Sequence, residues 1–297
     1  MKVTTAALAL LQTGFQTSFR GGLEQAPSQY KRISTIIPSS NKSETYGWLG
    51  KLPNVREWLG DRVIQNLKDH SYQILNKDWE LTIGVDRNDI EDDSVGQYSA
   101  LFQEMGYSTG AHSDQLVFSL LSAGFTTDCF DGQFFFDVDH PVIAADGSKT
   151  TTSNMTAGAA APWFLLDTSR ALLPIILQER KPWQFVARDA LTDENVFTKK
   201  EFQYGSDARS NVGYGLWQLA HGSKAVLDAT GYAAARTSMM SMKGDHGRPL
   251  GIIPNLLVVP PSLEGAANRI VKNELTGGGN TNEWAGTAEV LVVPWLA

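Results

Sequence analysis

The sequence predicts a mixed α+β fold, because strand and helix patterns alternate along the chain without a break in composition. The apolar run Leu256–Val259 and a second buried-strand pattern at 287–293 each stop at a proline, which has no N–H group with which to extend a sheet. A longer stretch, 95–123, repeats its apolar residues at helical spacing. With 297 residues, of which 42% are hydrophobic, the chain can bury one large core or two closely packed ones.

The first 42 residues predict a basic arm that contains a short amphipathic helix. Four apolar residues fall at helical spacing before a loop expected at the glycine pair 21–22: Leu8, Leu11, Phe15 and Phe19. This arm is basic, whereas the whole chain has a formal net charge of −7. It therefore indicates a contact between copies, with an ordinary solvated leader as the other interpretation. The start of the chain lacks a signal-peptide cleavage site, so we expect no secretion.

An aromatic segment at 46–85 predicts an extended hairpin that ends in the strand 79–85. Its expected tip, 51–61, contains Leu52, Val55 and Trp58, which are too apolar for a loop left in water. Two interpretations are open at this point. Either another molecule covers the tip, or the tip folds back into a small cluster of its own chain.

The acidic run 86–93 precedes the long helical pattern, where carboxylates complement the positive end of a helix. We therefore expect a long helix over 95–123, with Gly106 and Gly110 as weak points at which it could bend. The acidic run lacks the alternating ligands and the central glycine of a calcium loop, so a helix start explains it better.

The second half of the chain predicts further strands and two helices. We expect strands at 134–138, Trp163–Leu166 and 183–187, with a loop at 147–161, whereas 202–219 fits neither pattern clearly. Asp228 predicts the start of a helix over 227–242. Pro261 and Ser262 predict the start of another, whose apolar stripe comprises Leu263, Ala266, Ala267 and Ile270.

Composition excludes several classes of protein. The net negative charge argues against a body that coats nucleic acid, because phosphate binding needs clustered Lys and Arg. The single cysteine, Cys129, excludes an intramolecular disulfide and a cysteine-rich zinc site, and a packed core thiol is its expected state. No run approaches the roughly 18 to 20 apolar residues that cross a bilayer, so we expect no membrane-spanning role.

Signals for catalysis are weak. Asp137, Asp139 and His140 have side chains that could bind a divalent metal. Asp245 and His246 could act together as the general base of a hydrolase. A turn with satisfied side chains explains the first group better. The sequence contains no phosphate-binding loop, dinucleotide-binding glycine motif or serine-hydrolase elbow. We therefore expect no catalytic residue, no bound metal and no cofactor.

Five ordered blocks resemble the Mu-like prophage major head subunit family, the gpT type of tailed-phage capsid protein, nearly from end to end. The blocks are REWLGDR at 56–62, WELTIGVDRNDIEDD at 79–93, DGQFFFDVDHP at 131–141, GYGLWQLAHGSKA at 213–225 and GRPLGIIPNLLVVPPSLEGAA at 247–267. The resemblance implies the Hong Kong 97-type capsid fold. Its expected parts are an N-terminal arm at 1–40, an E-loop hairpin at 41–87, the main peripheral domain with a long spine helix at 88–225, an axial domain at 226–279, and a strand at 280–297 that returns to the peripheral domain.

The resemblance also implies a function. The chain would be the major capsid protein of a Mu-like tailed bacteriophage or prophage, not an enzyme, and would assemble into hexamers and pentamers of an icosahedral shell. It would act in the virion after assembly in the host cytoplasm. Its partners would be other copies, a separate scaffold protein, a portal, a decoration protein as a further candidate, and packaged double-stranded DNA on the inner face.

The expected contacts between copies lie on the hairpin, on the acidic run and on the arm. They are Trp48, Lys51, Arg56, Trp58, Arg62, Asp86, Arg87, Asp92, Phe15 and Phe19. The two arginines Arg56 and Arg62 would pair with carboxylates in 86–93 of a neighbour. Two alternatives stay open: a bacterial nanocompartment shell of the same fold, and a metal-dependent hydrolase that uses Asp137, Asp139 and His140.

Overall fold

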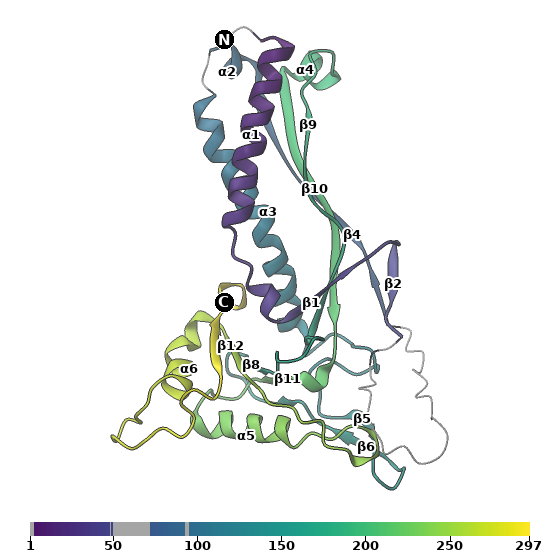
Figure 1. The fold of residues 1–297 in the computed structure, drawn as a ribbon, viewed down its shortest axis with the longest axis vertical. Helices are drawn as coiled ribbons and strands as arrows, with labels where there is room; N and C mark the ends of the chain where they lie inside the picture. Colours follow the sequence, from purple (N-terminus) through teal and green to yellow (C-terminus); the bar gives the residue numbers. More distant parts are fainter. Residues whose placement is uncertain (1–2, 48, 50–71, 93–94) are drawn as a thin grey trace.

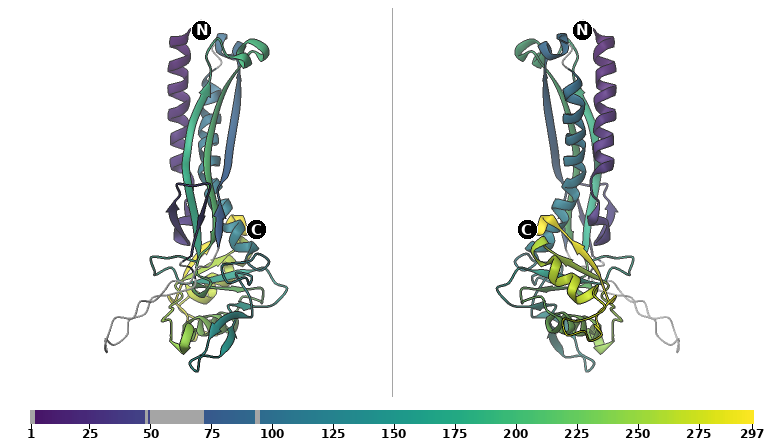
Figure 2. Two further views of the ribbon diagram at one scale, coloured as in Figure 1. Left: turned by 90° about the vertical axis from the view of Figure 1, so that its right-hand side faces the viewer. Right: turned by 90° about the vertical axis from the view of Figure 1, so that its left-hand side faces the viewer.

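The computed structural model describes residues 3–47, 49, 72–92 and 95–297. An elongated part holds the helices α1 (Thr5–Gln25) and α3 (Gly96–Ala123) beside a four-stranded sheet, and a broader part with a five-stranded sheet lies at one end (Figure 1). The two views of Figure 2 show α1, α3 and the long strands running side by side along the elongated part. The N-terminus lies at the far end of this part, and the C-terminus lies near the junction with the broader part.

The spine helix is confirmed, since α3 runs for 28 residues over Gly96–Ala123. Its internal glycines are sites of close contact with α1. A Cβ atom on Gly106 would lie 1.9 Å from the Phe19 carbonyl oxygen, and one on Gly22 would lie 1.8 Å from the Gln103 carbonyl oxygen. Only glycine allows the two backbones to approach so closely. The loop expected at 21–22 is therefore wrong, and α1 continues to Gln25 because Gly22 faces α3.

The apolar edge of α1 packs on its own chain. Phe15 and Phe19 are each 2% exposed, and the Phe15 ring stacks on Phe102 with a centroid separation of 4.3 Å. The expectation that these two residues contact another copy is therefore corrected. The long strands and α3 already supply the surface that the arm helix needs, so its burial requires no neighbour.

The sheet of the elongated part has the strand order β1-β9-β10-β4. Its strands are β1 (Ser34–Pro38), β9 (Ile175–Arg188), β10 (Glu201–Tyr214) and β4 (Lys77–Asp86). The strands expected at 79–85 and 183–187 are confirmed within β4 and β9, and the unassigned segment 202–219 is largely β10. β1 runs parallel to β9, and the other neighbours are antiparallel. The inner face packs with α1 and α3 into one apolar cluster: Leu8, Phe15, Phe19, Val85, Ile90, Phe102, Met105, Val196, Phe202 and Tyr204.

The far tip of the elongated part carries two short helices, α2 (Arg87–Glu91) and α4 (Glu194–Lys199) (Figure 1). The carboxylate of Asp86 accepts a hydrogen bond from the Asn88 N–H at 2.7 Å, so the acidic run begins α2 before the spine helix starts. The base of the expected hairpin is present as β2 (Ser43–Thr45) paired antiparallel with β3 (Gln73–Leu75). Its expected tip at 51–61 lies outside the described residues.

The sheet of the broader part has the strand order β13-β12-β8-β11-β7. Its strands are β13 (Glu289–Val292), β12 (Leu256–Val259), β8 (Trp163–Leu166), β11 (Ala220–Ser223) and β7 (Met155–Thr156). Every residue of β8 and β12 is buried, as their apolar runs predict. The last strand, expected to return to the peripheral domain, lies at the edge of this five-stranded sheet and pairs in parallel with β12.

Helices α5 (Ala229–Met240) and α6 (Glu264–Val271) belong to the broader part (Figure 1). Asp228 caps α5 by accepting from the Gly231 N–H at 2.7 Å, as predicted. Before α6, Pro261 opens a short 3-10 turn, but Ser262 makes no capping hydrogen bond. This turn is η4 (Pro261–Leu263), and the other 3-10 turns of the described residues are η1 (Gln29–Arg32), η2 (Trp217–Leu219), η3 (Asp245–Gly247) and η5 (Pro294–Leu296).

Two predictions for the segment after the spine helix are wrong. Residues 134–138 are not a strand, since within them only Phe134 pairs, in an isolated bridge with Asp128. The loop expected at 147–161 contains β7 and also β6 (Lys149–Thr152), which pairs antiparallel with β5 (His140–Ile143). The chain also crosses between the two sheets several times, so no single position in the sequence separates one sheet from the other. The predicted domain boundaries therefore remain predictions.

Candidate functional site

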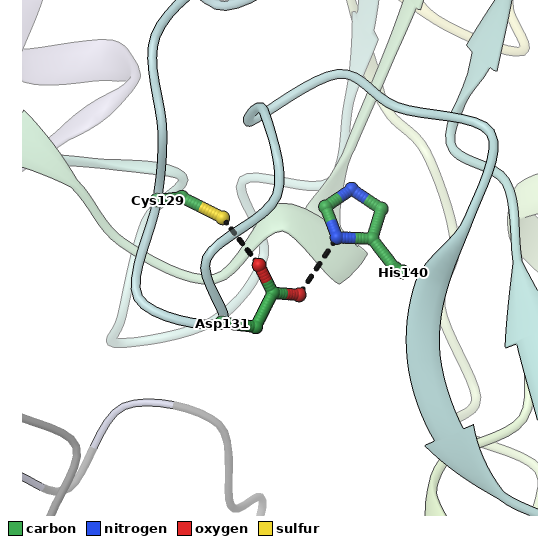
Figure 3. Close-up of side chains that lie close together, drawn as sticks. All are labelled: Cys129, Asp131 and His140. Atoms are coloured by element: carbon green, nitrogen blue, oxygen red, sulfur yellow. Dashed lines mark hydrogen bonds and ion pairs between the residues drawn. The ribbon is translucent and has the colours of Figure 1, made fainter. Parts of the chain in front are cut away.

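Cys129, Asp131 and His140 form the one group of potential metal ligands within the described part of the chain (Figure 3). The Asp131 carboxylate lies between the other two: Oδ2 is 2.7 Å from the His140 Nδ1, and Oδ1 accepts from the Cys129 thiol at 3.1 Å. The His140 side chain is 0% exposed and that of Asp131 is 7% exposed. The cluster is therefore closed to solvent.

The surrounding loops fix the His140 ring on both of its edges and on one face. The ring stacks on Trp217, with centroids 3.9 Å apart and an angle of 9° between the planes. Its Nε2 lies 3.2 Å from the Asn154 Oδ1. The amide of Asn154 donates to the Phe135 carbonyl at 2.8 Å, which orients its oxygen toward the ring. His140 thus links the turn that follows the spine helix to the start of β5 and to the loop before β7.

The electrostatics of the cluster favour a structural role over metal binding. Burial, and then the neighbouring Asp131, raise the pKa of the Cys129 thiol far above its usual range, whereas a metal needs the thiolate. Burial acts to raise the pKa of Asp131, but hydrogen bonds from His140 and Cys129 outweigh it and hold that pKa below its usual value. Each donor in the cluster is already matched by an acceptor, and the Asp131 carboxylate is the shared centre.

The residues predicted for a hydrolase do not converge. The Asp137 carboxylate accepts from the N–H groups of Phe134 at 3.2 Å and Val138 at 2.6 Å, which is the chemistry of a turn. Asp139 is exposed, so of the predicted triplet only His140 enters the buried cluster. The predicted pair of Asp245 and His246 does not form a buried catalytic site either. Asp245 accepts from the Ile143 N–H at 3.0 Å, and the His246 side chain is exposed.

The predicted contacts between copies fall into three groups. Five of them lie outside the described residues: Trp48, Lys51, Arg56, Trp58 and Arg62. Phe15 and Phe19 are buried in the chain's own core, as described above. The remaining three lie at the far tip, where Asp86 caps α2, Arg87 pairs with Glu91 at 2.8 Å, and Asp92 is exposed at the end of α2.

One surface feature escaped the sequence analysis. Phe197 is 88% exposed, although its helix α4 belongs to the segment that connects β9 to β10, the two longest strands of the elongated sheet. A signal was present in the sequence, since a lone aromatic residue in the polar stretch ENVFTKK has no apolar partner at helical spacing. Two open hollows on the described surface, of about 350 and 470 Å³, bring no histidine, cysteine or aspartate together. Among the described residues, no helix has the length and apolar character to cross a bilayer.

Comparison with known proteins identifies the class. The family model described as the Mu-like prophage major head subunit gpT matches residues 8–296. The chain is 44% identical over 305 residues to the major capsid protein of Escherichia phage Mu, with full coverage of both chains. It is 47% identical over 281 residues to the Mu-like prophage FluMu major head subunit of Haemophilus influenzae, covering 92% of this chain and 91% of that protein.

Solved structures agree over the whole length. The chain matches a subunit of the procapsid of bacteriophage JBD30 with a TM-score of 0.88 at 46% identity, covering 99% of this chain and 100% of that subunit. It matches a subunit of the JBD30 capsid with a TM-score of 0.81 at 35% identity, covering 100% of both. The fold is therefore the Hong Kong 97-type capsid fold, and the metal-dependent hydrolase alternative is not supported. The chain belongs to the Mu-like prophage major head subunit family of the gpT type, and it is a major capsid protein of the phage head and not an enzyme.

Proposed function

We propose that copies of this chain assemble as hexamers and pentamers into a closed icosahedral shell that holds double-stranded DNA. The observation that carries the proposal is the superposition of the whole chain on the JBD30 procapsid subunit with a TM-score of 0.88. A closed shell also requires each copy to present several different contact surfaces, and an elongated part joined to a broader part provides them.

The charge of the chain supports a container rather than a protein that coats DNA. The formal net charge is −7, so the subunit as a whole does not attract phosphates. Confinement within a shell and small counterions hold packaged DNA without extensive protein contacts. DNA on the inner face is therefore part of this proposal.

The shell would need partner proteins. A separate scaffold protein would guide assembly, which we infer takes place in the bacterial host cytoplasm, and a portal would occupy one opening of the shell. A decoration protein is a further candidate, because one related structure is the JBD30 capsid decorated with minor capsid protein trimers. The matching chain of that capsid is similar to this one with a TM-score of 0.78 at 36% identity.

The hairpin residues Trp48, Lys51, Arg56, Trp58 and Arg62 remain proposed contacts between copies. Aromatic side chains and arginines are enriched in the buried centres of protein interfaces. The segment that carries them joins β2 to β3, whose pairing brings its two ends together beside the elongated sheet.

Expression of the chain alone and together with the neighbouring head genes tests the proposal. We expect uniform closed shells in negative-stain images when the head genes are present, and irregular or no particles from the chain alone. Uniform shells from the chain alone would remove the separate scaffold from the proposal. A monodisperse monomer under both conditions, at high protein concentration, would contradict assembly itself.

The contents of the shells separate two kinds of container. Shells purified from lysed host cells and treated with nuclease should retain protected double-stranded DNA. Shells that retain an enzyme cargo and no protected genome would favour a nanocompartment of the same fold over a phage head.

A further inference from the structure

The strands β2 and β3 form a two-stranded sheet of their own, which stands beside the sheet of the elongated part (Figure 1). Within the described residues, no strand ladder joins these two sheets. Side chains must therefore hold the pair at its angle. On β10, the Asn211 amide donates to the Leu75 carbonyl at 2.7 Å, and the Tyr214 N–H donates to the Tyr72 hydroxyl at 2.8 Å.

The central contact is the amide of Gln178 on β9, a side chain that is fully buried. Its Nε2 donates to the Asn76 Oδ1 at 2.8 Å and to the Ile74 carbonyl at 3.2 Å. Its Oε1 accepts from the Tyr46 hydroxyl at 2.8 Å. Tyr46 directly follows β2, whereas Ile74 lies in β3. One side chain of the elongated sheet thus holds both strands of the pair.

The hydrogen bonds continue from Gln178 to the end of β1. The Asn76 Nδ2 donates to the Ser39 Oγ and to the Asn41 carbonyl, both at 2.9 Å. The Ser39 hydroxyl donates to the Glu44 Oε1, also at 2.9 Å. Gln178 and Asn76 therefore use both the nitrogen and the oxygen of their amides, so these two buried groups are satisfied.

The chemistry of these contacts favours one fixed direction for the strand pair. The apolar contact is small: Ile74 is 3% exposed and fits against Gly213, where a Cβ atom would lie 2.2 Å from the Ile74 Cδ1. Apolar packing alone tolerates small rotations and shifts. Hydrogen bonds depend on direction, and a fully satisfied buried network rigidifies its surroundings and specifies one arrangement.

We propose that Gln178 is a positioning residue for assembly. Its buried amide fixes the direction in which β2 and β3 leave the elongated part, and with it the direction in which the segment between them approaches a neighbouring copy. The inference rests on the proposed function, because it needs that segment to contact a second copy. It deepens the function by naming the buried group that orients the contact.

Distance measurements between two spin labels test the direction itself. Thr45→Cys on β2 and Thr13→Cys on α1 are both exposed and carry the labels, whereas the native Cys129 is buried and stays unlabelled. In the unassembled subunit we expect one narrow distance distribution by pulsed electron paramagnetic resonance. Gln178→Met, which keeps the length of the side chain and removes the amide, should broaden or shift it. Gln184→Met, which changes an exposed glutamine on the same strand, is the matched control and should not.

The yield of closed shells tests the consequence for assembly. With the head genes present, Gln178→Met should lower the yield by roughly tenfold, because three hydrogen bonds that orient the strand pair are lost. Gln184→Met should leave it unchanged. Thermal unfolding shows whether the Gln178→Met subunit is folded at the assembly temperature.

A milder variant keeps the test decisive if Gln178→Met does not fold. Tyr46→Phe removes only the hydroxyl that donates to Gln178, so the label distribution should broaden and the shell yield should fall several-fold. Tyr107→Phe, at a tyrosine that is 40% exposed on α3, is its control and should change neither property.

The outcomes separate this inference from the proposed function. If the unaltered chain forms no shells with the head genes present, the proposed function fails, whatever the label distances are. If it forms shells, a label distribution that is the same in folded Gln178→Met and Tyr46→Phe subunits overturns the role of the network. A broadened distribution together with a normal yield of shells overturns the role of Gln178 in assembly.

Discussion

At the scale of single residues, buried polar groups hold together parts of the chain that lie far apart in sequence. The Asp114 carboxylate, in the middle of α3, accepts from the Tyr30 N–H at 2.7 Å and so ties the end of the arm to the spine helix. The Asp131 and His140 pair does the same for the turn after α3 and the start of β5. Each such group is costly to bury and becomes more costly when its partner is removed.

Removal of the shared carboxylate should therefore destabilise the subunit. Asp131→Ala leaves the Cys129 thiol and the His140 Nδ1 without their acceptor in a buried site, so we expect a loss of about 3 kcal/mol in the free energy of unfolding. Chemical denaturation of the unassembled subunit measures it. Asp139→Ala, at an exposed position, is the control and should change stability by less than about 0.5 kcal/mol. Equal effects of the two variants would contradict a structural role for the cluster.

A second histidine makes stability depend on pH. His221 is buried, its Nε2 lies 2.9 Å from the Thr156 Oγ1, and burial lowers its pKa from 6.5 to about 4. Between pH 6.5 and 4, His221 is therefore protonated in the unfolded chain but neutral in the folded chain. The contribution of His221 to stability is complete above pH 6.5 and falls by about 3 kcal/mol as the pH drops to 4.

Comparison of variants isolates this effect from other titrating groups. Between pH 6.5 and 4, His221→Gln should lose about 3 kcal/mol less stability than the unaltered subunit, as measured by denaturation at each pH. His246→Gln, which changes an exposed histidine, should follow the unaltered subunit. Parallel curves for all three proteins would show that His221 does not titrate in this way.

At the scale of elements, glycines distinguish the packed face of α1 from its open face. Gly22 and Gly106 lie where α1 and α3 touch, whereas a Cβ atom at Gly14 or Gly21 would meet nothing within 4 Å. The same residue type is thus required at one pair of positions and is merely a weak helix former at the other.

Alanine substitutions should have opposite signs at the two kinds of position. Gly22→Ala should cost about 2 kcal/mol or more, because its Cβ would collide with the Gln103 carbonyl oxygen. Gly14→Ala should stabilise the subunit by about 0.5 to 1 kcal/mol through its higher helix propensity. Denaturant midpoints of the unassembled subunits measure both. Stabilisation by Gly22→Ala would contradict the close crossing of the two helices.

The arm helix is also part of the folded subunit, so its removal should affect folding before assembly. A chain that lacks residues 1–32 loses Leu8, Phe15 and Phe19 from the core cluster of the elongated part. Each large core side chain contributes about 3 kcal/mol, and the total stability of a domain is about 5 to 15 kcal/mol. We expect an aggregated or unfolded subunit, measured by solubility and thermal unfolding. Leu10→Ala, which shortens a side chain that is 76% exposed on α1, is the control and should leave the melting temperature unchanged.

At the scale of the whole molecule, the subunit joins an elongated part to a broader part and leaves several apolar side chains exposed at its periphery. Phe197, Leu10 and Val226 are 88%, 76% and 70% exposed. Single exposed apolar residues are ordinary, but an assembly that buries many surfaces per copy gives some of them a partner. The predicted hairpin contacts belong to the same scale.

Substitutions in the hairpin should act on assembly and not on folding. Trp58→Ala and Arg56→Ala should each reduce the yield of closed shells several-fold, because they remove an aromatic and a bidentate cationic contact between copies. Electron microscopy of shells and thermal unfolding of the unassembled subunits measure the two properties separately. Unaltered shells from both variants would remove the hairpin from the assembly mechanism.

The sequence by itself determined the elements whose signals are local. The helical repeat of 95–123, the cap at Asp228 and the proline that ends Leu256–Val259 act over a few residues, and the structure confirms each one. The five ordered blocks also identified the family, and with it the fold and the function.

Only the tertiary structure decided which surfaces meet. The docking of α1 on α3 and the meeting of Cys129, Asp131 and His140 depend on contacts between segments that no local pattern relates. The wrong strand at 134–138 has the same origin. Periodicity indicates that one face of an element is apolar. Which other element packs against that face is decided by the packing of the whole chain.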